Sequence, residues 1–219
     1  MTSRCLILLL CLLPFLRVAA ATPPPVEGFT ASPIPDAVWQ RMQGRSYHPG
    51  CPVGRDELRY LRLLHYNLEG EVKTGELVCH KELAADLLAI FRQLFEARYP
   101  IERMSLVDDY GADDVRSMQA NNTSCFNHRR IAGTNRLSLH SYGCAVDLNP
   151  LYNPWVSADG KKVSPKQGRP YARRSHPSPY VIKQGDLALR LFRRYGFTWG
   201  GSWRRAKDYQ HFEKKLSQP

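Results

Sequence analysis

One helical stripe dominates the hydropathy pattern of this chain. Over residues 81–98 the apolar side chains recur at helical spacing on one face, and Pro100 ends the pattern. Before it, residues 58–66 and 71–79 flank Asn67-Leu68-Glu69-Gly70 in the manner of a β-hairpin. No regular strand-helix-strand alternation follows, so the sequence predicts an α+β fold with an antiparallel sheet.

The remaining expected elements are shorter. A short amphipathic piece follows Asp36, and a second helix is expected over residues 184–195, ended by Gly196. Strands are expected at residues 104–107, 145–148, 197–201 and 209–212. Residues 108–130 are polar and predict a long functional loop, whereas residues 150–179 are rich in proline and predict irregular chain.

The first 21 residues have the pattern of a secretory signal. Arg4 precedes an apolar run over residues 5–16, and Val18-Ala19-Ala20-Ala21 offers small residues for a cut after Ala21. An uncleaved membrane anchor is the alternative, but the run is shorter than the roughly 20 residues that span a bilayer, and Pro14 interrupts it. We therefore expect export to the periplasm, cell envelope or medium, without stable membrane insertion after cleavage.

The rest of the chain suits an arm followed by one domain. Residues 22–35 contain five prolines and predict an extended spacer. The whole chain has 219 residues, and 43% of them are hydrophobic, so residues 36–219 can bury the core of a single domain. We expect it to be a monomer.

Export would place the cysteines in an oxidising compartment. The four beyond the signal are Cys51, Cys79, Cys125 and Cys144, which allow three pairings. We favour Cys51–Cys79 and Cys125–Cys144, because each pair closes a modest loop, although the sequence does not fix the connectivity. The spacing of these cysteines is wider than that of structural zinc clusters.

Two histidines lie near carboxylates at sequence spacings that suit metal binding. His140 precedes Asp147 across a turn that contains Gly143, and Asp208 precedes His211 by three residues. Two histidines and one aspartate leave a tetrahedral zinc ion with one open position, which is the catalytic arrangement. Asp208 would then be a free carboxylate that moves protons. The alternative is that His140 and His211 each cap a turn or bind a carbonyl group.

These residues resemble a known family. Ser138-x-His140-x-x-Gly143-x-Ala145-x-Asp147, followed by Asp208-x-x-His211, is similar to the signature of the M15 zinc D-alanyl-D-alanine peptidases. Further blocks resemble the endolysin-like subgroup, which cleaves L-alanyl-D-glutamate bonds. These blocks are residues 122–129, 147–154, 197–203 and 208–212, so the core motifs span about residues 100–213.

The resemblance implies roles for particular residues. One zinc ion would be held by His140, Asp147 and His211, with Asp208 as the acid/base. Arg129, or its neighbour Arg130, would hold a substrate carboxylate or carbonyl, and Ser138 would bind the substrate backbone. The implied fold is a small α+β domain whose central antiparallel sheet carries the zinc site, as in the hedgehog domain.

The implied function is that of an exported zinc metallopeptidase. The expected substrates are peptidoglycan stem peptides, cleaved in the manner of a D-alanyl-D-alanine carboxypeptidase. The alternatives are an L-alanyl-D-glutamate endopeptidase and a non-catalytic zinc-binding module. Removing Arg4 and Arg17 with the signal changes the net charge from +11 to +9, which would attract an anionic envelope. Nucleic acid is disfavoured as a partner because the chain shows no nucleic-acid motif.

Overall fold

The computed structural model describes residues 27–216. The expected signal over residues 1–21 lies outside this range. The largest sheet has the order β1-β2-β3 and is antiparallel throughout. Its strands are β1 (Thr30–Ser32), β2 (Leu58–Tyr66) and β3 (Val72–His80), and β2 and β3 form the hairpin that the sequence predicts.

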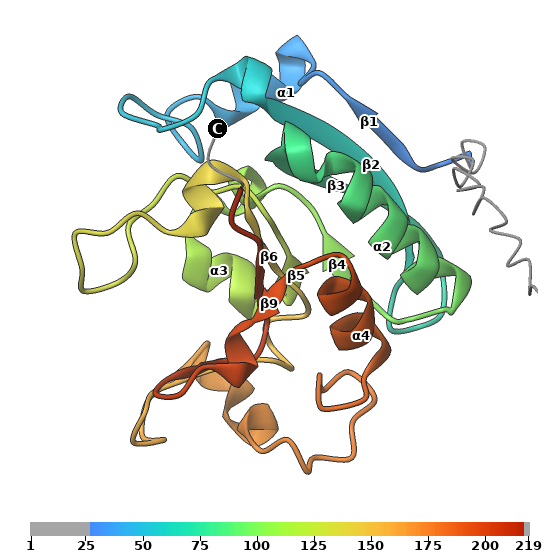
Figure 1. Cartoon of the computed structure of the whole chain (residues 1–219), viewed down its shortest axis with the longest axis vertical. Helices are drawn as coiled ribbons and strands as arrows, with labels where there is room; N and C mark the ends of the chain where they lie inside the picture. The colour runs from blue at the N-terminus through green and yellow to red at the C-terminus, as the bar shows by residue number, and fades with distance from the viewer. Residues whose placement is uncertain (1–26, 217–219) are drawn as a thin grey trace, which may run out of the picture.

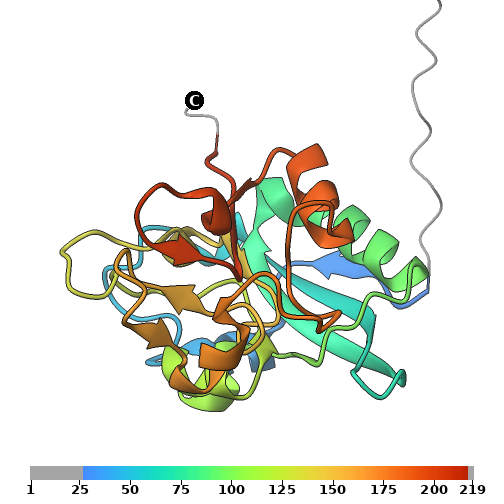
Figure 2. The ribbon, with the colours of Figure 1, turned by 90° about the horizontal axis from the view of Figure 1, so that it is seen from below.

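The main helix covers one face of this sheet. Helix α2 (Ala84–Glu96) packs on β2 and β1, and α4 (Leu187–Arg194) packs beside it (Figures 1 and 2). The buried stripe of α2 contributes Leu87, Ile90, Phe91 and Leu94 to the main core, as the helical spacing predicts. Alternation along β2 and β3 buries the other face as well, because Leu58, Tyr60 and Val78 join a second core with Met42 of α1 (Asp36–Met42).

Residues 27–216 also form three small sheets. Antiparallel β6-β11-β9 consists of Ala145–Asp147, His211–Glu213 and Thr198–Trp199, and antiparallel β10-β7-β8 consists of Lys207–Asp208, Trp155–Val156 and Val163–Ser164. Strands β4 (Arg103–Met104) and β5 (Asn122–Thr123) are parallel. The predicted mixture of helices and antiparallel strands is confirmed, with the strands divided among several small sheets.

The prediction of a long polar loop over residues 108–130 is wrong. This segment forms a 3-10 turn (Val107–Tyr110), helix α3 (Asp114–Gln119) and β5. The Asp113 side chain caps α3 by accepting a hydrogen bond from the backbone N–H of Arg116 at 3.0 Å. The segment over residues 150–179 likewise contains β7, β8 and a 3-10 stretch (Lys166–Ala172).

The described part of the proline-rich segment is not a free spacer. Residues 30–32 pair with Arg62, Leu61 and Tyr60 of β2, so β1 forms one edge of the large sheet. Phe29 and Ile34, on either side of β1, are buried in the two cores. Apolar side chains next to the prolines therefore anchor residues 27–35 to the domain.

The predicted pairs Cys51–Cys79 and Cys125–Cys144 are corrected by the structure, in which all four thiols are free. Three of these thiols approach different backbone carbonyl groups. Cys51 points to the carbonyl of Ser141, Cys125 to that of Gly143 and Cys144 to that of Tyr142. Burial raises the pKa of the Cys144 thiol to about 12, which disfavours the reactive thiolate.

Within residues 27–216, no helix is both long and apolar enough to cross a membrane.

Candidate metal centre

A short turn holds His140 in place. The turn Leu139–Tyr142 begins at Ser138, whose side-chain oxygen accepts a hydrogen bond from the backbone N–H of His140. Gly143 ends the turn with φ +67°, and a Cβ atom there would lie 2.5 Å from the backbone nitrogen of His80. The turn therefore sits directly against β3, and this close approach requires glycine.

The next two side chains face each other across neighbouring strands. Asp147 of β6 pairs in register with His211 of β11. The Asp147 Oδ1 atom lies 3.0 Å from His211 Nδ1, and the Oδ2 atom lies 3.2 Å from His140 Nε2. The two imidazole nitrogens are 3.2 Å apart, and all three side chains are buried. The structure thus brings together His140, Asp147 and His211 in one group that could hold a metal ion, and we call these three residues the metal group.

The spacing of these atoms fits a zinc ion. Ligand atoms at zinc distances in a tetrahedral arrangement lie about 3.3 Å from one another. The three observed separations, 3.0 to 3.2 Å, are close to that value.

In each histidine, the ring nitrogen that points away from the group has a hydrogen-bond acceptor. This acceptor favours the tautomer whose other nitrogen, inside the group, carries a lone pair. The Nδ1–H of His140 donates to the carbonyl oxygen of Cys125, and the Nε2–H of His211 donates to Glu213 Oε2 at 3.1 Å. In the neutral imidazoles, His140 Nε2 and His211 Nδ1 therefore carry the lone pairs that can bind a cation. Metal-binding histidines commonly have such outer partners.

Electrostatics also favour a cation here. Although burial opposes ionisation of Asp147, the neighbouring His140 and His211 hold the pKa of its carboxyl well below its usual value. For His211, burial lowers the pKa, but the hydrogen bonds to Asp147 and Glu213 outweigh burial and raise the pKa to about 10. The group thus attracts positive charge, which a metal ion can supply in place of a proton.

Asp208 lies next to this group but is not a member of it. It ends β10, and a Cβ atom at Gly200 would lie 2.6 Å from its carbonyl oxygen, so Gly200 permits the close packing there. Burial raises the pKa of the Asp208 carboxyl to about 6, against the opposing charge of His211. A carboxylate with such a pKa is suited to exchange a proton near neutral pH.

The expected substrate-binding residues lie on both sides of the hairpin over residues 129–138. The Arg129 guanidinium makes an ion pair with Asp114 at 2.9 Å, while the Arg130 side chain is exposed and donates to the carbonyl of Asn135. The buried Ser138 serves as the cap of the His140 turn described above.

Sequence reasoning missed Glu213. It lies two residues after His211 on the same strand, and this spacing places both side chains on one face. An acidic residue two positions from a strand histidine is therefore the signal that could have revealed this partner of His211.

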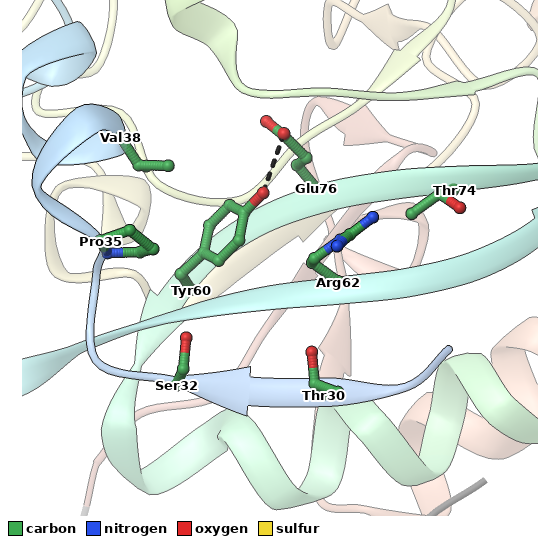
Figure 3. Close-up of a pocket in the computed structure, with 8 residues that line it drawn as sticks. All are labelled: Thr30, Ser32, Pro35, Val38, Tyr60, Arg62, Thr74 and Glu76. Carbon is green, nitrogen blue, oxygen red and sulfur yellow. Dashed lines mark hydrogen bonds between the residues drawn. The ribbon is translucent and has the colours of Figure 1, made fainter. Parts of the chain in front are cut away.

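A separate cavity of about 540 Å³ opens on the outer face of the large sheet (Figure 3). Tyr60 and Glu76 line it and are hydrogen-bonded at 2.8 Å, and Glu76 also pairs with Arg41 at the rim. None of the three metal-group residues lines this cavity.

A buried group of two histidines and one aspartate, with a further carboxylate nearby, is an arrangement typical of metal-dependent hydrolases. The comparison with protein families agrees. Residues 132–214 match the family described as D-alanyl-D-alanine carboxypeptidase, which supports the predicted resemblance to the M15 peptidases. The match contains His140, Asp147, Asp208 and His211, whereas Arg129 lies before it.

Searches of curated proteins and of solved structures return no significant match. The family match supports a D-alanyl-D-alanine carboxypeptidase-like hydrolase.

Proposed function

We propose that this chain is an exported zinc metallopeptidase that removes the terminal D-alanine of peptidoglycan stem peptides. The observation that carries the proposal is the group of three ligand atoms separated by 3.0 to 3.2 Å. Both histidines in it turn their N–H groups outward. The family match supports the peptidase chemistry.

The proposal gives each of these residues a role. His140, Asp147 and His211 hold one zinc ion, which supplies Lewis-acid chemistry at a peptide carbonyl and acidifies water. Asp208 accepts a proton from the attacking water and gives it to the departing amine. Arg129 positions a substrate carboxylate with its planar donors, and Asp114 orients that guanidinium.

The surroundings suit a peptide with terminal carboxylates. The chain without residues 1–21 has a net charge of +9, as derived above, and this charge raises the local concentration of anionic cell-wall peptides. Trp203 is partly exposed, and its ring centroid lies 5.4 Å from that of His211, so it forms an aromatic wall beside the group. Substrate preference is expected to depend on this wall.

Two alternatives share the same metal group. An L-alanyl-D-glutamate endopeptidase would use identical chemistry on another bond of the stem. A non-catalytic zinc-binding module would keep the ligands without needing a free carboxylate. The raised pKa of Asp208 favours an enzyme over the module.

The test is mass spectrometry of defined muropeptides after incubation with the purified chain, with chelator and with zinc added back. Loss of one terminal alanine, abolished by chelator and restored by zinc, is the expected result. Release of a stem that begins at D-glutamate would instead establish the endopeptidase. No cleavage by a zinc-loaded sample would refute both enzyme proposals, and His140→Ala serves as the metal-deficient control.

A further inference from the structure

A second cavity, of about 680 Å³, lies beside the hairpin over residues 129–138. Its lining contains two arginines and two histidines but no acidic residue, and it includes none of the three metal-group residues. These four residues are His48, His128, Arg129 and Arg130. We name it the His48–His128 pocket.

The two histidines form a fixed wall. Their rings stack with centroids 4.1 Å apart and an interplanar angle of 25°. The Nε2–H of His48 donates to the carbonyl oxygen of His128 at 3.1 Å, and the backbone N–H of His128 donates to the carbonyl of Ser46. The His128 side chain is 7% exposed, and its Nδ1 atom is buried without a hydrogen-bond partner. An unpartnered buried nitrogen costs folding free energy, and a bound ligand can offset this cost.

The two arginines differ in how their charge is balanced. Arg129 pairs with Asp114 at 2.9 Å, so its charge is largely compensated. Arg130 is exposed and donates to the backbone carbonyl of Asn135. Among the described residues, no carboxylate lies within ion-pair distance of Arg130. The pocket therefore has an excess of positive charge.

The pocket is connected to the metal group through the backbone. The N–H of Asn127 donates to the carbonyl of His140 at 3.1 Å, and the N–H of Arg129 donates to Ser141 Oγ at 3.0 Å. The hairpin of the pocket and the segment over residues 200–208, which carries Asp208, extend toward the same side in both views (Figures 1 and 2). A peptide bound at the metal group could thus extend to the pocket.

We propose that the His48–His128 pocket binds a carboxylate of an acidic peptide substrate, at a residue other than those joined by the cleaved bond. The inference rests on the proposed peptidase function. Arg130 supplies the charge and a planar pair of donors that matches a carboxylate, while the stacked histidines shape the wall. The pocket thereby selects acidic peptides over their amidated forms.

The test compares two stem pentapeptides that end in D-alanyl-D-alanine, one with a free D-glutamyl α-carboxylate and one with that group as an amide. Calorimetric binding to the zinc-loaded full chain is measured with Asp208→Asn, to suppress cleavage. We expect the acid to bind about tenfold more tightly than the amide. Arg130→Gln should reduce this ratio to near one, and His48→Gln should reduce it if that variant keeps its unfolding temperature.

Arg136→Gln is the matched control, because Arg136 is exposed on the same hairpin but does not line the pocket. It should keep the preference for the acid. Equal affinity for both peptides, or a preference that survives Arg130→Gln, overturns the proposal. Inorganic phosphate is titrated separately, and binding of phosphate without any acid preference would identify a phosphate site and also overturn it.

Cleavage by the unsubstituted chain is measured in parallel. Absence of cleavage with a retained acid preference refutes the peptidase and leaves the pocket standing as a peptide-binding site. Cleavage of both peptides without any difference in affinity refutes the pocket alone.

Discussion

His211 donates its Nε2–H to Glu213, two residues further along the same strand, and so presents Nδ1 to Asp147 and His140. This hydrogen bond fixes both the tautomer and the ring orientation of His211. It makes Glu213 a positioning residue for the metal group, acting through a ligand.

Glu213→Gln should weaken zinc binding because the amide is a poorer acceptor for the His211 N–H. We expect a loss of about tenfold to a hundredfold in affinity, measured by competition with a chromogenic chelator. Glu71→Gln, on the exposed hairpin of the large sheet, is the control and should bind zinc normally. An unchanged affinity in Glu213→Gln would show that the carboxylate does not influence His211.

Asp208→Asn should separate metal binding from turnover. The substitution keeps the shape of the side chain and the oxygen that accepts a hydrogen bond from Gln210, so fold and zinc content should be normal. Peptide cleavage should fall by about a hundredfold or more, because the proton acceptor is lost. Zinc content and cleavage rate are measured on the same sample, with Asp159→Asn on an exposed turn as control. Retained turnover would remove Asp208 from the acid/base role.

Gly143→Ala should destabilise the chain far more than Gly160→Ala. Both glycines have positive φ, +67° and +71°, but only a Cβ atom at Gly143 would collide with backbone, whereas that at Gly160 meets open space. We expect a loss of about 1 kcal/mol for Gly160→Ala from backbone strain alone. For Gly143→Ala we expect a loss of about 3 kcal/mol or more.

Urea unfolding of both glycine variants measures the difference in their free energies of unfolding. Their zinc content shows whether the turn that carries His140 keeps its geometry. Similar losses in the two variants would show that the contact between Gly143 and β3 is not needed.

The stability of the fold should decrease on mild acidification because of His65. Its side chain is buried, and its Nδ1–H donates to the carbonyl of Ile101 at 2.7 Å. Burial lowers the pKa of His65 below its ordinary value of 6.5, so the unfolded chain binds this proton more readily than the folded chain. The contribution of neutral His65 is therefore present above about pH 6.5 and is lost as the pH falls below it.

His65→Gln should lose less free energy of unfolding than the unsubstituted chain between about pH 7 and about pH 5. Denaturant titrations at both pH values measure this change. An identical pH dependence in the two proteins would contradict the assignment to His65.

The elements that the sequence predicts best are those whose periodicity is local. The stripe of α2 and the alternation of β2 and β3 are long enough to be read without knowledge of their partners. Strand β1 consists of Thr30, Ala31 and Ser32 between prolines, and only its pairing with β2 makes it a strand. Helix α3 is six residues long, too short for a hydrophobic period, although Asp113 offers a cap signal.

The metal group could be predicted because its motif is compact and resembles that of a known family. The partners of its residues could not be predicted. The ion pair between Arg129 and Asp114 joins a hairpin to a helix, and the acceptor for His140 is a backbone carbonyl, which any residue at position 125 would provide. Such contacts depend on tertiary packing and cannot be recognised from the residue types in the sequence.

The strands β6 and β9 both pair with β11, yet fifty residues of chain separate them, residues 148–197, which form α4, the 3-10 stretch and the very short strands β7 and β8. The register of β6 with β11 places Asp147 opposite His211, so changes confined to exposed turns of this long segment need not move either side chain. The spacing between these two ligand atoms and the shape of the surface around them can therefore vary independently in this architecture.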